Sequence, residues 1–431
     1  MSTLVERIAG IGKADFRKLD PRAIAEPMAI ASPLALIVSA QEFVMSAVAI
    51  LFVLNSWRAH DFSWARQGWF VAIAALWAYA LLRTLLGAPS ATAASIALHW
   101  IHFPLYAAAL ANWILPDARA RRRLLMATIA ALAFYAADCL LQYSFGRDII
   151  GRAMYGERLT SVFSKPGVGI EIAWLFLPAA LGLWQLGQRP AAALFSLACV
   201  LAVFLTGDRM GLLIALAEAV LAGVLARPLR KPLLIALPLV GLLAGAALLL
   251  RPALYQRQVA STLNVIEHLD RSPYGVIFSS AAAIAEDHPV FGVGVHKYQE
   301  TCLDERYGPP IVGREARCQG HPHNWYLQWL AETGLIGLGL YIAFVVLALG
   351  AVWRGARANA GNLIFAGLVA SLLLRLWPLS AGTGFYSSWS VEPFFLILGW
   401  TLAYCPLAEV RGDAALSAPS RHVSHGGTLG V

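Results

Sequence analysis

The chain has 431 residues, of which 59% are hydrophobic and 13% are charged, and its formal net charge is +8. A soluble domain has about 45–50% apolar and about 25% charged residues, so this composition excludes an ordinary soluble protein. Many arginines and lysines lie in short segments between apolar blocks, where such residues orient membrane spans, and this placement argues against a nucleic-acid-binding protein.

The apolar residues fall in blocks of about 18 to 25 residues, the length at which a helix crosses a bilayer. Lipid offers no partner to free backbone polar groups, so continuous apolar blocks predict helices. The sequence therefore predicts an all-α fold, a polytopic transmembrane helical bundle. The predicted spans are 31–55, 68–87, 92–115, 122–145, 168–187, 191–206, 208–226, 232–250, 325–350, 361–379 and 389–405.

Three basic loops set the expected orientation of the bundle. Their cationic residues are Arg119, Arg121, Arg122 and Arg123 in the first loop, Arg227, Arg230 and Lys231 in the second, and Arg354 and Arg357 in the third. The positive-inside rule predicts that these loops are cytoplasmic. The segments 146–167, 207–208, 251–324 and 380–388 are then expected on the opposite side of the membrane.

The basic N-terminus is also expected inside, and this requires an even number of spans. The block 27–56 is therefore expected to form two short or re-entrant helices, with a break near Gln41 and Glu42, which gives about twelve helices. The predicted organisation is an N-terminal cytoplasmic segment, a first bundle part, a large outer loop, a second bundle part and a Ser/Gly-rich, disordered cytoplasmic tail. The corresponding ranges are 1–26, 27–250, 251–324, 325–405 and 406–431. An outer loop of that length in a compact protein is typical of a functional segment.

Two of the five cysteines, Cys302 and Cys318, lie sixteen positions apart in the large outer loop. An oxidising compartment permits a disulfide there, which would stabilise the fold by about 3 kcal/mol. The alternative is a metal site, because Cys318, His321 and His323 follow a C-x2-H-x-H pattern. A structural zinc needs four ligands and no second cluster is present, so the disulfide is favoured and no metal site is predicted.

The stretch GHPHNWYLQWLAETGLIG, residues 320–337, places polar residues at the start of an apolar helix. A histidine titrates near neutral pH, so His323 is a candidate general base, with His321 and Asn324 in support. Glu332 lies two turns further into the helix, where a charge is costly unless it is used or paired. The alternative is an interfacial histidine beside an aromatic belt.

Four arginines are predicted on the same side of the membrane as His323. Arg209 and Arg375 lie at the outer ends of spans, and Arg158 and Arg271 lie in outer segments. Together these groups would form an anion site, and the guanidinium fork fits phosphate oxygens. A diphosphate at a membrane surface suggests a lipid-linked substrate. The alternative is that one or two of these arginines extend to lipid headgroups.

Five segments together resemble the O-antigen ligase and polymerase superfamily, membrane glycosyltransferases of the GT-C type. They are DCLLQYSFGRDIIG with RLTSVFSKPG (138–167), LTGDRMG (205–211), HPVFGVGVHKYQETC (288–302), HPHNWYLQWLAETGLIG (321–337) and RLWPLSAGTGFYSSW (375–389). The resemblance covers about residues 70 to 405. Its most specific part is the histidine-Asn helix start with Glu332, Gly334 and Gly337, preceded by FGVG.

The resemblance implies an O-antigen ligase of lipopolysaccharide biosynthesis in the bacterial inner membrane. The donor would be a glycan on undecaprenyl diphosphate, and the acceptor a lipid A-core sugar, handled on the periplasmic face. It also implies about twelve helices and a large periplasmic loop before the histidine helix. The base would be His323 and the diphosphate would bind Arg209 and Arg271, with Arg158 or Arg375 taking part if Arg271 is displaced.

The outer loops contain no D-x-D pair, so a metal-independent, inverting transfer without a cofactor is expected, with membrane lipids as the other partners. The glycines of FGVGVHKY would bring backbone close to the glycan or a phosphate, or form a plain tight turn. The nearest alternative is a polymerase of the same superfamily. A secondary transporter would show inverted repeats, which are not visible, and a non-enzymatic scaffold would not explain the clustered basic groups.

Overall fold

The computed structural model describes residues 20–35, 40–87, 91–156, 158–250, 252–307, 318–380, 382 and 384–405. Within these residues all named elements are helical, with two isolated β-bridges and no strand. Seven helical segments of the described chain are long and apolar enough to cross a membrane. The predicted all-α, multi-pass membrane fold is therefore confirmed. The predicted tail 406–431 and most of the predicted segment 1–26 lie outside the described residues.

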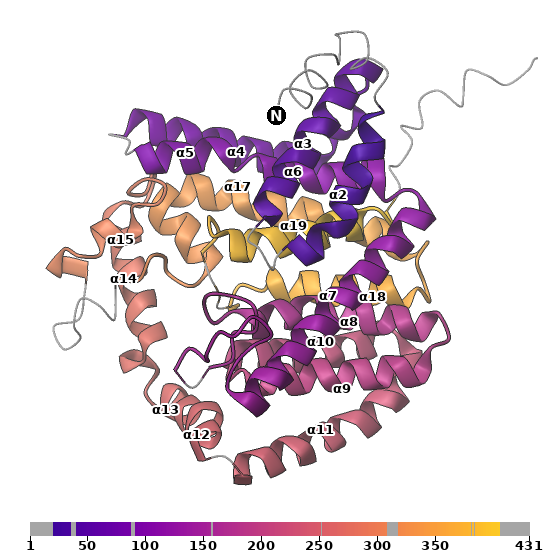
Figure 1. The fold of residues 1–431 in the computed structure, drawn as a ribbon. Helices are drawn as coiled ribbons and strands as arrows, with labels where there is room; N and C mark the ends of the chain where they lie inside the picture. Colours follow the sequence, from indigo (N-terminus) through magenta and orange to yellow (C-terminus); the bar gives the residue numbers. More distant parts are fainter. Residues whose placement is uncertain are drawn as a thin grey trace, which may run out of the picture.

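The helices of the first bundle part follow one another with short connections, except for the long segment 146–167 between α7 and α8 (Figure 1). They are α2 (Pro21–Ala35), α3 (Gln41–Ala59), α4 (Gly68–Leu86), α5 (Ala91–His99), α6 (His102–Ala109), α7 (Ala118–Phe145), α8 (Val168–Gln185), α9 (Arg189–Leu205), α10 (Arg209–Leu225) and α11 (Arg230–Leu250). The second part contains α17 (Trp325–Ala356), α18 (Leu363–Arg375) and α19 (Ser388–Leu402).

The segment predicted as a large outer loop is mostly short helices. It contains α12 (Pro252–Tyr255), a π-helical turn (Gln256–Ala260), α13 (Ser261–Glu267), α14 (Pro273–Asp287) and α15 (Tyr298–Thr301). In Figure 1 these elements run along one side of the bundle, from the end of α11 towards α17. The segment therefore forms a layer across the ends of the spans.

The block 27–56 contains two helices, α2 and α3, and α3 begins at Gln41, the expected break point. Hydrogen bonds fix α2 to later helices: the Tyr106 hydroxyl donates to Ser32 Oγ over 2.9 Å, and the Tyr135 hydroxyl donates to the Pro33 carbonyl over 2.9 Å. Buried hydroxyls need such partners because an unpaired polar group in a low-dielectric interior is costly.

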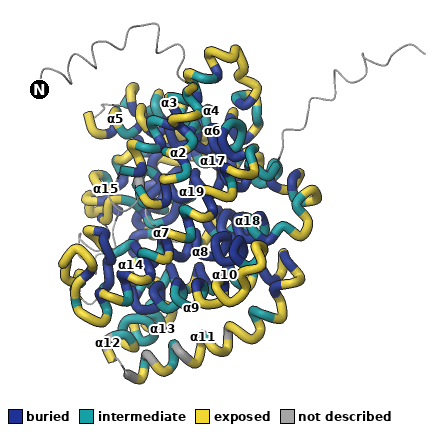
Figure 2. The backbone as a smooth tube through the Cα atoms, turned by 45° about the vertical axis from the view of Figure 1, so that its right-hand side comes forward, coloured by how far each residue is buried: buried dark blue, intermediate teal, exposed yellow. Residues whose placement is uncertain are grey.

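The helix α8 lies at the centre of the bundle. Nearly all of its residues from Val168 to Leu183 are buried, and all of these except Glu171 are apolar or glycine, which suits a helix enclosed by other helices. The helix α11 is the opposite case, since it runs along one edge and most of its described side chains are exposed (Figure 2). A long apolar helix with one open face leaves a surface for lipid beside α9 and α10.

The helix α17 is interrupted at Gly334, whose φ of 68° and ψ of −166° are not helical. The loop 289–294, which contains FGVG, packs against this interruption. Three backbone hydrogen bonds join them, from Val293 N to Ala331 O (3.0 Å), from Gly294 N to Glu332 O (2.8 Å) and from Leu335 N to Pro289 O (2.8 Å). The interruption frees backbone groups of the helix, and the loop satisfies them. The glycines at this junction therefore allow the backbone of the loop 289–294 to lie close to the backbone of α17. The sequence alone did not indicate this contact.

The helix α4 holds the same junction from the other side. The Tyr79 hydroxyl donates to the Thr333 carbonyl over 3.0 Å. The Arg83 guanidinium donates to the carbonyls of Phe291 and Gly292, each over 3.3 Å, and lies 5.4 Å from the centre of the Phe291 ring. An arginine inside a span is thereby paired with backbone oxygens, as its cost in lipid requires.

Replacing Gly292 by alanine is expected to lower the free energy of unfolding by about 2–5 kcal/mol. Its φ is 64°, and an added Cβ would overlap the backbone of Glu332 and Thr333. The melting temperature in detergent measures the effect. The control is Gly339→Ala in α17, where nothing lies within 4 Å of an added Cβ. Equal melting temperatures for the two variants would contradict this close packing.

Candidate functional site

The two histidines before α17 face one another, with ring centroids 4.5 Å apart. His323 has a φ of 53°, a left-handed conformation that non-glycine residues adopt at a cost and that is common at functional sites. Gly382 holds this conformation, because its N–H donates to the His323 carbonyl over 2.8 Å. A segment 59 positions further along the chain therefore fixes the backbone around His323.

The imidazole of His323 is oriented by the same glycine. His323 Nδ1 lies 3.1 Å from the Gly382 carbonyl oxygen. A carbonyl only accepts hydrogen bonds, so Nδ1 carries the proton and Nε2 keeps its lone pair. A histidine in this tautomer can take a proton at Nε2, which is the property required of a general base.

The protonation of both histidines is shifted by their surroundings. Burial lowers the pKa of His323 below its usual value of 6.5, although the hydrogen bond to Gly382 opposes this change. Burial and the neighbouring His323 lower the pKa of His321 to about 4. Both imidazoles are therefore neutral at pH 7, and His323 is ready to accept a proton.

Asn324 supports this segment in two ways. Its side-chain oxygen caps α17 by accepting from Leu327 N over 3.0 Å. Its side-chain nitrogen donates to the carbonyls of Pro378 (2.7 Å) and Ser380 (3.3 Å). One side chain thus joins the start of α17 to the segment that orients His323.

Glu332 lies deeper in α17 and is 1% exposed. Its Oε1 lies 3.4 Å from Tyr298 N, and its carbonyl accepts from Gly294 N. These contacts join α17 to the loop before α15. Glu332 therefore lies at the junction where the segment 294–298 packs against α17.

The turn between α9 and α10 carries the second part of the site. Asp208 caps α10 by accepting from Gly211 N over 3.0 Å, and its other oxygen lies 4.0 Å from an Arg158 nitrogen. Arg257, from the π-helical turn after α12, donates from Nε to the Gly207 carbonyl over 2.8 Å. Three separate segments of the chain therefore meet at this turn.

The turn gathers an excess of positive charge. Burial and the charges of Arg158 and Arg209 lower the pKa of Arg257 below its usual value, while Asp208 partly offsets them. Arg158 Nε is buried and has no hydrogen-bond partner among the described residues. Three arginines, Arg158, Arg209 and Arg257, are close enough to act on one another, with Asp208 as the partly offsetting carboxylate, so this cluster favours an anion such as a diphosphate.

Arg158 is placed by a network on α7. Gln142 Oε1 accepts from Thr160 N (2.8 Å) and Ser161 N (3.0 Å). Asp138 Oδ2 accepts from the Ser161 hydroxyl over 2.6 Å. Asp138 and Gln142 are four residues apart and share one helix face, so they fold the following loop back onto α7.

The other two predicted arginines lie elsewhere. Arg271 ends a short turn, where its 75% exposed side chain lies 3.6 Å from Asp270. Arg375 is buried at the end of α18, with its guanidinium 4.8 Å from the Trp174 ring and 4.3 Å from the Trp325 ring, and it donates to the Ser390 carbonyl over 3.1 Å. No described contact joins either arginine to the Arg158–Arg209–Arg257 cluster.

Tyr274, at the start of α14, connects the histidines with the arginine cluster. Its ring lies 6.2 Å from the His323 ring in an edge-to-face arrangement. Its phenol is also close enough to act electrostatically on Arg257. The structure therefore brings His323 and the arginine cluster to one region of the molecule.

Arg257 is a site residue that no motif in the sequence singled out. It occurs in YQRQ, directly after the predicted span 232–250, just as Arg209 lies at the end of its own span. An arginine at the outer end of a span was the available signal. Arg257 is far from Gly207 and Arg209 along the chain, so the sequence did not indicate that they meet. Their proximity depends on the path of α11 and α12.

Cys302 and Cys318 form a disulfide, as predicted. The bridge removes Cys318 from the C-x2-H-x-H pattern, so the metal alternative loses its thiolate. Among the described residues no group of three or more His, Cys, Asp or Glu side chains is arranged to hold a metal ion. The bridge tethers the chain two residues before Gly320 and so limits the movement of His321.

Removing the bridge by the double change Cys302→Ser and Cys318→Ser is expected to cost about 2–4 kcal/mol of stability, since the bridge closes a loop of sixteen positions. Thermal unfolding in detergent measures the loss. Dithiothreitol should lower the melting temperature of the wild type by a similar amount and leave that of the double variant unchanged. A wild type that does not respond to complete reduction would contradict a stabilising role.

Residues 193–342 match the family model described as O-antigen ligase. No curated protein matches the chain. The matched part runs from α9 into α17 and contains Arg209, Arg257, His323 and Glu332. The match covers about a third of the chain, and it supports the resemblance to the O-antigen ligase and polymerase superfamily.

Proposed function

We propose that the protein is a membrane glycosyltransferase of the O-antigen ligase type. It moves a glycan from undecaprenyl diphosphate to a sugar hydroxyl of lipid A-core, on the periplasmic face of the bacterial inner membrane. The observation that carries the proposal is the contact of His323, with a free Nε2 lone pair, with Tyr274, whose phenol also acts electrostatically on Arg257 of the Arg158–Arg209–Arg257 cluster. A base and an anion site are the two elements that this transfer needs.

The arginine cluster is proposed to hold the diphosphate of the donor. Guanidinium groups fixed in advance stabilise the charge that develops on the leaving diphosphate. Arg271 remains a candidate for an outer phosphate oxygen or for the glycan, because its side chain is exposed. Arg375 is proposed to act through Trp325, the first residue of α17, because their side chains are stacked.

An apolar groove supports a lipid-linked donor. A pocket of about 500 Å³ lies between α8, α9, α10 and α11, and Ser196 is the only polar residue among its described lining side chains. A smaller pocket shares Leu197, Val200 and Val240 with it and continues to Phe204 and Leu212. That end adjoins the arginine cluster, because Gln258, next to Arg257, donates to the Phe204 carbonyl over 3.0 Å. A polyprenyl chain in this groove would present its diphosphate to the arginines.

The proposed reaction is one displacement. The acceptor hydroxyl gives its proton to His323 Nε2, and its oxygen attacks the anomeric carbon of the donor sugar. The bond between that carbon and the diphosphate oxygen breaks, and undecaprenyl diphosphate leaves with the electron pair. The configuration at the anomeric carbon inverts, and neither a metal ion nor a cofactor takes part.

The experiment supplies the purified protein with undecaprenyl-diphosphate glycan, with and without lipid A-core, and resolves the products by mass. Glycan on lipid A-core would support the ligase. Longer glycan on the lipid carrier, without need of lipid A-core, would identify a polymerase of the same superfamily. Unchanged product formation in EDTA is expected, and loss of activity in EDTA would contradict the metal-independent mechanism.

The rate of transfer is expected to follow the protonation of His323. Its pKa is lowered by burial from 6.5, so the base is neutral at pH 7 and becomes protonated only in more acidic solution. The value of kcat/KM should therefore rise with pH, with a midpoint below 6.5, and be constant near pH 7. A midpoint above 7 would contradict the assignment of this limb to His323.

A further inference from the structure

An open pocket of about 870 Å³ lies at the other end of α7 from the Arg158 loop. The helix α7 has 28 residues, so its two ends are about 40 Å apart. The lining residues are Ala23, Glu26, Pro27 and Ile30 of α2, and Arg119, Arg122, Arg123 and Met126 of α7. This α2–α7 pocket is therefore separate from the site around His323.

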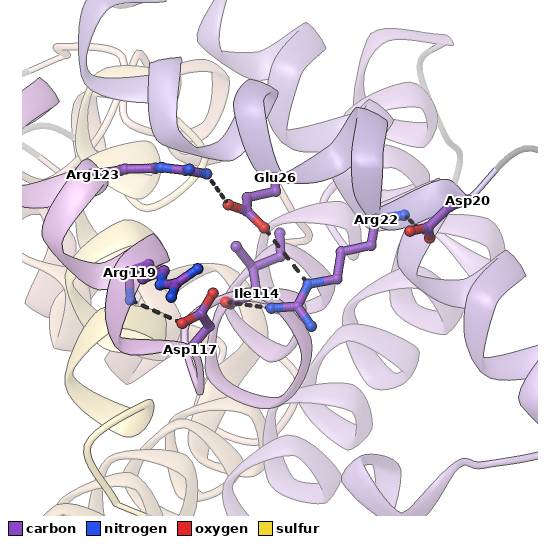
Figure 3. A network of polar contacts seen from close by, with 7 residues as sticks. All are labelled: Asp20, Arg22, Glu26, Ile114, Asp117, Arg119 and Arg123. Atoms are coloured by element: carbon purple, nitrogen blue, oxygen red, sulfur yellow. Dashed lines mark hydrogen bonds and ion pairs between the residues drawn. The ribbon is translucent and has the colours of Figure 1, made fainter.

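Among the described residues, Glu26 is the only carboxylate that lines the pocket, and it is already paired. Figure 3 shows Glu26 between Arg123 and Arg22, at 2.8 Å and 3.7 Å respectively. The backbone of Arg119 donates to Asp117 over 2.9 Å, but no hydrogen bond or ion pair engages the Arg119 and Arg122 guanidinium groups in the described chain. The pocket therefore carries positive charge in excess.

Arg121, in the same run of arginines, has a structural role. It donates to the carbonyls of Leu115 (2.6 Å) and Pro116 (3.0 Å) and lies 5.0 Å from the centre of the Tyr404 ring. Helix packing accounts for this arginine. It does not account for Arg119 and Arg122, which are exposed and line the pocket instead.

The wall beside these arginines is apolar. Pro27, Ile30 and Met126 continue the pocket along α2 and α7, and α7 is one of the helices long enough to cross the membrane. A soluble anion would bind the arginines and make no use of the apolar side chains. A phospholipid would use both, the arginines for its headgroup and the apolar side chains for an acyl chain. Basic pockets between membrane helices bind anionic headgroups in this way.

We propose that the α2–α7 pocket binds an anionic glycerophospholipid. The headgroup phosphate contacts Arg119 and Arg122, and an acyl chain lies against Pro27, Ile30 and Met126. The positive-inside rule predicts that the lipid comes from the cytoplasmic leaflet. The proposal does not depend on the glycosyltransferase function, because the pocket shares no residue with that site.

The test measures phosphatidylglycerol binding to the purified full-length protein by native mass spectrometry. The double variant Arg119→Gln and Arg122→Gln is expected to bind roughly ten- to thirtyfold more weakly than the wild type. The matched control is Arg354→Gln with Arg357→Gln, which removes the same charge from two exposed arginines of another basic loop. The control should bind like the wild type, and an equal loss in both double variants would overturn the pocket in favour of surface charge.

A second comparison separates a lipid from a free anion. Phosphatidylglycerol should raise the melting temperature of the wild type, while inorganic phosphate and phosphatidylcholine should not. Stabilisation by inorganic phosphate to the same extent would overturn the proposal and leave a soluble-anion site. If the double variant does not fold, Arg122→Gln alone gives the decision, since wild-type binding by that variant would also overturn the proposal.

Discussion

Replacing His323 by alanine is expected to lower the rate of glycan transfer by about 10²–10⁴, the range that a positioned general base contributes. Nε2 is the atom that accepts the proton, and alanine offers no substitute for it. The loss should appear in kcat, with little change in the binding of the donor, because the arginine cluster is untouched. Product mass after incubation with both substrates measures the effect.

The matched control for this variant is His268→Ala. His268 is an exposed histidine of the segment 251–324 that directly follows α13, and no described contact joins it to His323. Its removal should leave transfer within about twofold of the wild type, since surface substitutions change little. Full activity of the His323→Ala protein, folded by its melting temperature, would leave His323 as an interfacial residue and remove the base from the mechanism.

Local features of the site could be predicted because they depend on residues close in sequence. The polar run before α17 marked His323 and Asn324, and the sixteen-residue spacing marked the disulfide. The polar pair at Gln41 and Glu42 marked the division between α2 and α3. In each case a few neighbouring residues were enough for the prediction, either polar side chains unsuited to lipid or two cysteines close enough to pair.

Features that depend on distant segments could not be predicted in the same way. Gly334 interrupts α17 because the loop 289–294 supplies backbone partners, and hydropathy alone shows only a continuous apolar block. Gly382 orients His323 from 59 positions away. Arg257 meets Arg158 and Arg209 because α12 turns the chain back towards the end of α9. These contacts follow from the packing of the helices and leave no periodic pattern in the sequence.

Replacing Arg257 by glutamine is expected to lower kcat/KM for the donor by about 10²–10³, the loss found when one preorganised group that stabilises developing charge is removed. Its guanidinium lies among the other two arginines of the cluster and has lost part of its hydration there. The effect should depend on the donor and leave the KM for lipid A-core nearly unchanged. Steady-state kinetics with the donor and then lipid A-core varied separate the effect on the donor from the effect on the acceptor.

Arg271→Gln is the matched comparison, because both arginines lie in the segment 251–324 and both variants lose the same charge. Arg271 is exposed and lies beside Asp270, so its contribution should be within about fivefold, as for a screened surface pair. Arg257→Lys should retain part of the activity, since the charge remains while the fork that spans two phosphate oxygens is lost. A larger loss for Arg271→Gln than for Arg257→Gln would assign the diphosphate to Arg271, as the family resemblance first implied. The bound donor would then draw the turn before α14 towards the arginine cluster, and Arg257 would serve to hold the Gly207 turn in place.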